Sequence, residues 1–255
     1  MTDPTTVFLL EGTMMKRLIC ALLALLLALP MGLACAEELR GYTKDAGYVY
    51  VNLGRYPQKE DGTVLPLLWR VLTVDEDKAY LCSEYVLFAM PMHVNYTEYK
   101  TIGSDFGQTE LCHYLNGEFA DAAFTEEELS LLQDFETYGK VFLLDSSDLK
   151  SKEVGMGVGE GLKAWGTEYA IKVTGLYVFR PRFGSHSPYW TRNQSTTDLR
   201  HARCTKDGGQ LGHIVSDREN EGVRPAAYLD LSLAEIVSGT GTMDDPFIVG
   251  KKAAE

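Results

Sequence analysis

The sequence predicts an α+β fold formed by a single domain. Stretches of alternating or continuous apolar residues, which are typical of β-strands, occur towards both ends of the chain. Between them, apolar residues recur at three- and four-residue intervals, the spacing that predicts helices. Strands and helices that are segregated along a chain in this way favour an α+β arrangement. No repeat or linker divides residues 47–250, so we expect one domain over residues 37–255.

Three strands are expected in the first part of this domain. YVYVNLGRYPQ (48–58) alternates in polarity and is expected to end at Pro57. LPLLWRVLTVDEDKAYLCSEYVL (65–87) favours two strands joined by an acidic turn at residues 75–77. Trp69, in the first of these two strands, is expected to lie in the core.

Two helices are expected after these strands. TELCHYLNGEF (109–119) has its apolar residues on one stripe, and Thr109 is suited to cap the helix N-terminus. FTEEELSLL (124–132) has Thr125 followed three residues later by Glu128, which is the capping-box pattern. Its acidic run is therefore a helix-start signal rather than a cluster of catalytic carboxylates.

Four further stretches predict the C-terminal strands. KVFLLDSSDL (140–149) and YWTRNQ (189–194) each favour a strand, and HARCTKDGGQLGHIV (201–215) favours a hairpin around a Lys-Asp-Gly-Gly turn. EGVRPAAYLDL (221–231) favours a closing strand that contains an Arg-Pro pair. Because proline has no N–H to donate to a ladder, we expect this strand to be an edge strand or to be bulged at Pro225.

The N-terminal residues predict export. Residues 1–14 are an upstream segment without a pattern of its own, whereas residues 15–36 combine two basic residues, an apolar run of 12 residues and an Ala-Cys-Ala site. This arrangement is typical of a secretory signal peptide, so we expect cleavage before Glu37 and a secreted or cell-surface location. The alternatives are an uncleaved anchor, for which the run is shorter than the roughly 20 residues of a membrane span, and lipid attachment at Cys35, for which Gly32 is a poor match.

The composition restricts the partners that this chain can have. Its net charge of −12 argues against nucleic acid, whose phosphates require clustered Lys and Arg, and against anionic lipid surfaces. Cleavage of the signal peptide leaves no expected membrane span and three cysteines, Cys82, Cys112 and Cys204. An odd number permits at most one internal disulfide, and we favour buried, reduced thiols.

No motif in the chain predicts a catalytic, cofactor or metal site. GMGVGEG (155–161) lacks the preceding strand and following helix of a phosphate-binding loop. His201, Cys204 and His213 could ligate zinc, but a structural zinc site needs four ligands and no fourth lies nearby, so we expect no stoichiometric zinc. We therefore predict no catalytic residues, no metal and no cofactor.

Seven segments together resemble a family of uncharacterised extracytoplasmic bacterial domains. They are WRVL, AYLCSEYVL, LNGEFADAAFTEEE, VFLLDSS, YWTRN, GVRPAAYLDL and GTGTMDDPF, which follow one another from about Tyr48 to Val249. The chain departs from the family pattern at Cys112 and Tyr114, where the family has Arg and Trp. Its closing segments are also distantly similar to the ends of C-type-lectin-like and formylglycine-generating-enzyme-like domains, which implies a C-type-lectin-like architecture without implying a function.

Five residues form the predicted ligand site: Tyr189, Trp190, Arg192, Asn193 and Arg224. Tyrosine and tryptophan pack through their rings while their polar ends bond, which suits recognition of sugars or proteins. The arginine preceding Pro225 is held in an extended conformation and offers five donors, so we expect it first of all to satisfy carbonyls or an acid inside the fold. Arg192 is expected to be more exposed.

Three classes of function follow from these observations. The leading prediction is a secreted, non-catalytic binding module for a glycan or a cell-surface protein. The alternatives are a structural or interaction domain of the cell envelope and, third, an enzyme whose chemistry no motif reveals.

Overall fold

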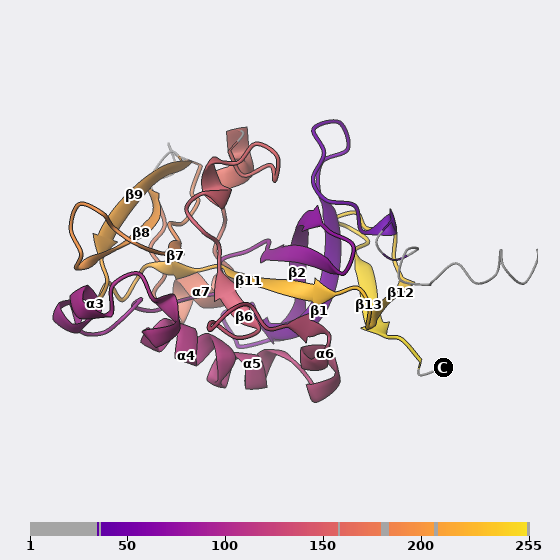
Figure 1. Ribbon diagram of the computed structural model, residues 1–255, viewed down its shortest axis with the longest axis horizontal. Coiled ribbons are helices and arrows are strands. Elements are labelled where there is room, and N and C mark those ends of the chain that lie inside the picture. Colours follow the sequence, from indigo (N-terminus) through magenta and orange to yellow (C-terminus); the bar gives the residue numbers. More distant parts are fainter. Residues whose placement is uncertain (1–34, 36, 158, 180–183, 207–208, 254–255) are drawn as a thin grey trace, which may run out of the picture.

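The structure is a computed structural model that describes residues 35, 37–157, 159–179, 184–206 and 209–253. It confirms the predicted α+β class, with strands in the majority and short helices (Figure 1). Strands β1, β2 and β11 cross the middle of the molecule, and helices α4, α5 and α6 lie along its lower side. Strands β7, β8 and β9 lie at the opposite end of the molecule from β12 and β13. The segment predicted to be a signal peptide falls outside the described residues except for Cys35.

The main sheet has the strand order β12-β13-β1-β2-β3-β11-β5, and β6 also pairs with β11. Every pairing is antiparallel except that between β1 and β13, which is parallel. The strands are β1 (Val49–Pro57), β2 (Val64–Val74), β3 (Lys78–Ser83), β5 (Leu132–Gln133), β6 (Val141–Leu143), β11 (Pro225–Asp230), β12 (Ala234–Ser238) and β13 (Phe247–Lys251). The strands predicted from the first part of the domain are therefore confirmed, and β12 and β13 were not predicted.

The helices lie between β4 and β7 in the chain. They are α3 (Tyr96–Ile102), η1 (Phe106–Gln108), α4 (Glu110–Asn116), α5 (Glu118–Ala123), α6 (Glu126–Ser130), η2 (Asp148–Lys150), η3 (Gly159–Leu162) and α7 (Glu168–Lys172), where η denotes a 3₁₀ helix. Thr109 caps α4 by accepting from the Cys112 N–H, and the Thr125–Glu128 capping box is present, as predicted. The predicted first helix is interrupted at Gly117, whose ψ of −103° lies outside the helical region.

Two small sheets complete the fold. Strands β7 (Trp190–Gln194), β8 (His201–Lys206) and β9 (Gln210–Val215) form a three-stranded antiparallel sheet, in which the predicted hairpin is β8–β9. The remaining pair is β4 (Phe88–Ala89) with β10 (Gly222–Val223).

The chain changes sheets at Arg224. Strand β10, which ends just before this residue, pairs with β4, whereas β11, which begins just after it, lies between β3 and β6 in the main sheet. Of the two predicted alternatives, the edge strand is wrong, and in place of a bulge the strand is interrupted at Arg224 and resumes in the main sheet at Pro225. Pro225 is tolerated because it is the first residue of β11, a position at which a missing N–H does not break the ladder.

The core joins the main sheet to the helices below it. Trp69 is fully buried, as predicted, and its indole N–H donates to the Leu53 carbonyl at 2.8 Å. The rings of Tyr56, Phe88 and Phe119 lie 5.0–5.8 Å apart and connect β1, β4 and α5. In the part of the chain that the structure describes, no helix is long and apolar enough to cross a membrane.

Candidate functional site

Three of the five predicted site residues lie in the interior. Tyr189, Trp190 and Arg224 all have no exposed surface. The Tyr189 hydroxyl donates to the Leu162 carbonyl at 2.8 Å, and the Trp190 indole N–H donates to the Met90 carbonyl at 3.0 Å. These side chains therefore hold neighbouring segments together and present no surface to a ligand in this conformation.

The other two predicted residues contact the segment that follows β6. The Arg192 guanidinium donates to the Leu143 carbonyl at 2.9 Å and lies 3.3 Å from the Asp145 carboxylate. The Asn193 amide donates to the same carboxylate at 2.8 Å and accepts from the Ser146 N–H at 2.6 Å. Arg192 is more exposed than Arg224, as expected, but its side chain is only 17% exposed and is engaged with the protein. None of the five predicted residues lines the hollows described below, so their role in ligand binding stays a prediction.

Arg224 forms hydrogen bonds inside the fold, as the sequence predicts. Its Nε donates to the Ser83 carbonyl at 2.7 Å, and its Nη1 donates to the Tyr189 hydroxyl at 3.2 Å. The guanidinium also lies 5.1 Å from the centre of the Tyr189 ring. Arg224 therefore ties the junction of β10 and β11 to the end of β3 and to the residue before β7. Its Nη2 has no hydrogen-bond partner among the described residues.

A buried ion pair that was not predicted from the sequence lies near Arg224. Arg70 on β2 and Glu84 after β3 are 5% and 4% exposed, and they form a bidentate ion pair. Burial alone would raise the pKa of the Glu84 carboxyl, but the Arg70 hydrogen bond and the charges of Arg70 and Arg224 place it below its ordinary value. The arrangement is structural, because its groups are withdrawn from solvent and satisfy one another.

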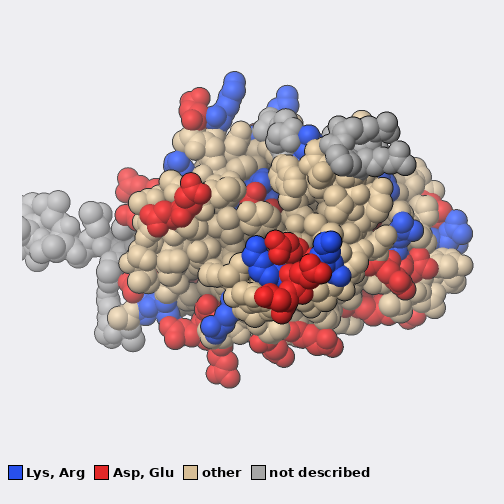
Figure 2. Space-filling view, turned by 180° about the vertical axis from the view of Figure 1, so that it is seen from behind, with Lys and Arg blue, Asp and Glu red and all other residues tan. Residues whose placement is uncertain are grey.

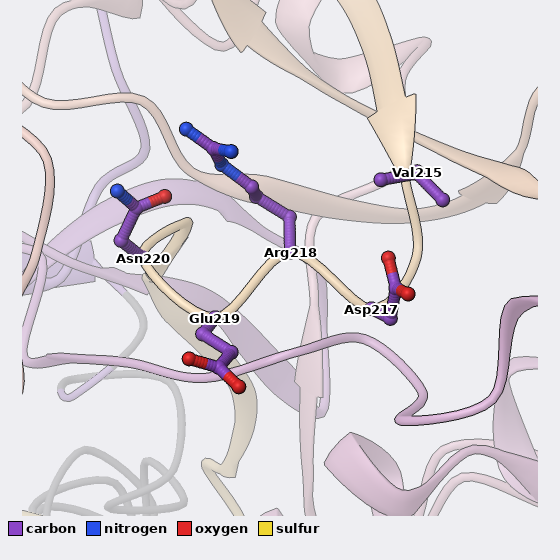
Figure 3. Close-up of a pocket in the computed structure, with 5 residues that line it drawn as sticks. All are labelled: Val215, Asp217, Arg218, Glu219 and Asn220. Atoms are coloured by element: carbon purple, nitrogen blue, oxygen red, sulfur yellow. The ribbon is translucent and has the colours of Figure 1, made fainter.

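The candidate site is the turn that connects β9 to β10 (Figure 3). A hollow of about 360 Å³ is lined there by Val215, Asp217, Arg218, Glu219 and Asn220. Figure 3 shows the Arg218 and Asn220 side chains extending to the same side of the turn, while Glu219 points to the other side. The Arg218 N–H donates to the Val215 carbonyl at 3.2 Å, which closes the turn.

A smaller pocket of about 90 Å³ shares two residues with this hollow. Arg218 and Asn220 line both of them. The smaller pocket is completed by Tyr177, Phe179, Pro188, Lys206, Ile214 and Glu221. The Tyr177 N–H donates to the Asn220 carbonyl at 3.0 Å, so the tyrosine is fixed beside the turn, and its side chain remains 43% exposed.

Glu221 is the most unusual group of the smaller pocket. It is 3% exposed, and its Oε1 has no hydrogen-bond partner among the described residues; the Asn220 Oδ1 also lacks one. Burial raises the pKa of the Glu221 carboxyl to about 7, although the Cys204 thiol and the charges of Lys206 and Arg218 act in the opposite direction. Buried acceptors normally have donors, so two without them indicate a place where a ligand or water donates.

A third hollow, of about 440 Å³, lies beside α4. It is lined by Met90, Glu110, His113, Tyr114, Gly117 and Glu118. The Glu110 carboxylate is engaged there, because it lies 2.5 Å from the His93 Nδ1 and accepts from the Val94 N–H at 2.8 Å. We therefore place the candidate site at the β9–β10 turn, where two residues that line the pocket, Asn220 and Glu221, each have a buried oxygen without a hydrogen-bond partner among the described residues.

The residues considered for zinc do not converge. Cys204 is fully buried against β7, whereas His201 and His213 lie on the opposite face of the hairpin, with their Nδ1 atoms 2.8 Å apart. Among the described residues, no group of three or more His, Cys, Asp or Glu is placed to hold a metal ion. The absence of stoichiometric zinc stays a prediction.

Comparison with known protein families, curated proteins and solved structures found no match for this chain. The site is therefore argued from its own geometry. Sequence reasoning missed it because Tyr177, Lys206 and Glu221 come from three separate segments. Glu221 was predicted only as the start of a strand, and its single sequence signal was a carboxylate that directly precedes an apolar run.

Proposed function

We propose that this protein is a secreted, non-catalytic binding module, that its ligand is a glycan, and that the ligand binds at the β9–β10 turn. The observation that carries the proposal is the pair of buried acceptors, Glu221 Oε1 and Asn220 Oδ1, which lack donors and line a pocket beside an exposed tyrosine. Sugar hydroxyls supply donors of this kind, and a ligand that donates to both atoms removes the cost of leaving them unsatisfied.

The other groups around the turn support a sugar over a purely apolar ligand. Tyr177 is 43% exposed and supplies an aromatic ring against which the C–H groups of a sugar can pack, and its hydroxyl can form hydrogen bonds. Arg218 and Asn220 add donors in planar groups at fixed positions on a short turn. The hollow at the β9–β10 turn, of about 360 Å³, is at the lower end of the size range of small-molecule sites. This volume accommodates one or two sugar rings.

A C-type-lectin-like architecture is part of the proposal. It is supported by the order of the closing elements: a strand that begins at Trp190, the β8–β9 hairpin, and the Gly-Val-Arg-Pro segment at residues 222–225. Export is supported by the signal-peptide pattern of residues 15–36. An exported protein meets cell-surface glycans and does not meet cytoplasmic ligands.

A catalytic role for Glu221 is the second candidate, and its raised pKa favours it. A carboxyl that titrates near neutral pH in a pocket is suited to general acid or base catalysis. The neighbouring Cys204 thiol is fully buried, and burial is the main reason that its pKa lies far above its ordinary value, so it is not a ready nucleophile. We therefore prefer a binding role, which needs only Glu221 and its pocket, to a catalytic role, which would also need a reactive partner group.

The test is a binding experiment with the exported protein. Neutral monosaccharides and disaccharides, acidic sugars and soluble cell-wall glycan fragments would be titrated against the protein and followed by calorimetry. We expect saturable binding of at least one of these sugars, and we expect Tyr177→Ala and Glu221→Gln each to weaken it by about tenfold.

The control is Tyr96→Ala, which removes a comparably exposed tyrosine, 41% accessible, from α3. This variant should bind like the parent. The proposal fails if no sugar in the panel binds, or if Tyr96→Ala weakens binding as much as Tyr177→Ala does. Hydrolysis of a fragment that Glu221→Gln abolishes would instead favour the catalytic candidate.

A further inference from the structure

The guanidinium of Arg218 is available to a ligand. Arg218 is exposed and lines both hollows, and within the described part of the chain its side chain forms no hydrogen bond or ion pair. The two carboxylates of the same turn do not engage it: Glu219 points to the other side of the turn, and Asp217 lies beside Val215 (Figure 3). Its planar fork of five donors, which matches a carboxylate, is therefore free.

A second cation approaches the smaller pocket from a different element. Lys206 is the last residue of β8 and lines this pocket together with Arg218. The positive charges of both side chains act on the Glu221 carboxyl and lower its pKa, so both lie within electrostatic reach of the same group. The carboxylates of Asp217 and Glu219 line the larger hollow but not the smaller one.

The smaller pocket is consequently a positive site in an acidic protein. It contains two cations and one carboxyl, and burial disfavours the charged form of that carboxyl. The chain as a whole carries a net charge of −12. The local excess of positive charge therefore selects an anionic group on the ligand, although the net charge disfavours polyanions at long range.

We propose that the glycan bound at the β9–β10 turn contains an acidic sugar, whose carboxylate is bound by Arg218 and Lys206 while its hydroxyls donate to Glu221 and Asn220. This inference rests on the proposed function and adds the chemical class of the ligand. Arg218 is the specificity-determining residue, because it belongs to both hollows and can bind the carboxylate through two parallel N–H donors. Lys206 contributes a point charge from the end of β8.

The experiment uses pairs of sugars that share a ring and differ in the group that carries the carboxylate. Glucuronic acid is compared with glucose, and N-acetylmuramic acid with N-acetylglucosamine, by calorimetry on the exported protein at low ionic strength. We expect at least one acidic sugar to bind about tenfold more tightly than its neutral counterpart, and the difference to shrink as salt is added.

Two variants identify the groups responsible. Arg218→Gln should weaken binding of the acidic sugar about tenfold more than it weakens binding of the neutral sugar, and Lys206→Gln should have a smaller effect in the same direction. Arg55→Gln is the matched control, because Arg55 is an exposed arginine on β1 in the main sheet and should leave both affinities unchanged.

The outcomes separate this inference from the function on which it rests. If neutral and acidic sugars bind equally, or if Arg218→Gln weakens both to the same extent, the carboxylate inference is overturned and glycan binding stands. If neither class of sugar binds, glycan binding itself is overturned. If Arg55→Gln reproduces the loss, the effect comes from overall charge, and Arg218 has no specific role.

Discussion

At the residue scale, the buried charges of the main sheet form a connected group. Arg70, Glu84 and Arg224 contribute two cations and one anion, and none of them is more than 5% exposed. Glu84 interacts electrostatically with both arginines, and a hydrogen bond joins Arg224 to Ser83, the residue next to Glu84. A buried charge that loses its partners has no water to replace them, so each member of the group is costly to remove.

Arg224→Ala is expected to destabilise the protein by about 3–5 kcal/mol, a large share of a typical unfolding free energy. The substitution removes a fully buried side chain and leaves the Ser83 carbonyl and the Tyr189 hydroxyl without this donor. Chemical denaturation measures the effect.

Arg192→Ala serves as the graded comparison for Arg224→Ala. Because the Arg192 side chain contacts Leu143 and Asp145, we expect Arg192→Ala to lower the free energy of unfolding by about 1–2 kcal/mol. Arg55→Ala, on an exposed position, should be silent. A protein that unfolds alike with and without Arg224 would refute its structural role.

Glu221 should impose a pH dependence on stability. Its carboxyl pKa is raised from 4.5 to about 7 mainly by burial, so the folded state holds a proton that the unfolded state releases. Its favourable contribution is therefore complete below pH 4.5 and is lost as the pH rises through 7. We expect the parent to lose up to about 3 kcal/mol over this window relative to Glu221→Gln. Denaturation curves of both proteins between pH 4 and 8 test this, and parallel curves would contradict it.

At the element scale, Asn116 joins helix α4 to the segment that leads into β6. Its amide group donates to the carbonyls of Tyr138 and Val141 at 2.7 and 2.8 Å, and its Oδ1 accepts from the Val141 N–H at 3.0 Å. The side chain of Asn116, the last residue of α4, therefore provides hydrogen-bond partners for three backbone groups of the segment that leads into β6. The helix stops at the following residue, Gly117.

Asn116→Ala is expected to lower the unfolding free energy by about 2 kcal/mol, because it leaves several backbone groups without a partner. Asn116→Asp keeps the acceptor for Val141 and loses the donors, so it should fall between the parent and the alanine variant. Urea denaturation measures both. If aspartate proves as damaging as alanine, the acceptor contributes nothing, and if alanine is silent the junction is held by other contacts.

At the scale of the whole molecule, acidic side chains gather on the face formed by the helices. Figure 2 shows Asp and Glu along the lower edge of the molecule, the edge that α4, α5 and α6 occupy in Figure 1. The exposed acids of these elements are Glu118, Asp121, Glu126 and Glu127. The net charge is therefore unevenly spread, and the helical face repels anionic surfaces.

The thiols of the mature domain should be inaccessible in the folded state. Cys82, Cys112 and Cys204 are free and buried, and burial raises the pKa of the Cys112 thiol to about 12. We expect a chromogenic thiol reagent to find no fast-reacting group in the native protein and three after denaturation. One thiol after denaturation would indicate a disulfide.

Export should release the domain before Glu37. The Ala-Cys-Ala site at residues 34–36 is the reason for this expectation. Mass spectrometry of protein exported by its host measures the N-terminus directly. An intact Met15 or a lipid-modified Cys35 would contradict cleavage at this position.

Local features of the sequence predicted the elements that depend on near neighbours. The caps at Thr109 and Thr125, the β8–β9 hairpin and the internal role of Arg224 follow from residues a few positions apart or from the cost of burying a charge. The α+β class follows from the order of such elements along the chain.

The tertiary structure alone decided which distant segments meet. The central place of β11, the parallel pairing of β1 with β13, and the burial of Tyr189 and Trp190 depend on contacts between residues far apart in the chain. The same is true of the pocket at Glu221, which needs Tyr177, Lys206 and the β9–β10 turn to come together. The sequence shows a glutamate before a strand. Glu221 becomes a candidate binding group only because the folded chain buries its carboxyl and provides no donor for Oε1 among the described residues. The free-energy cost of burying an unpaired polar atom depends on the surrounding tertiary structure.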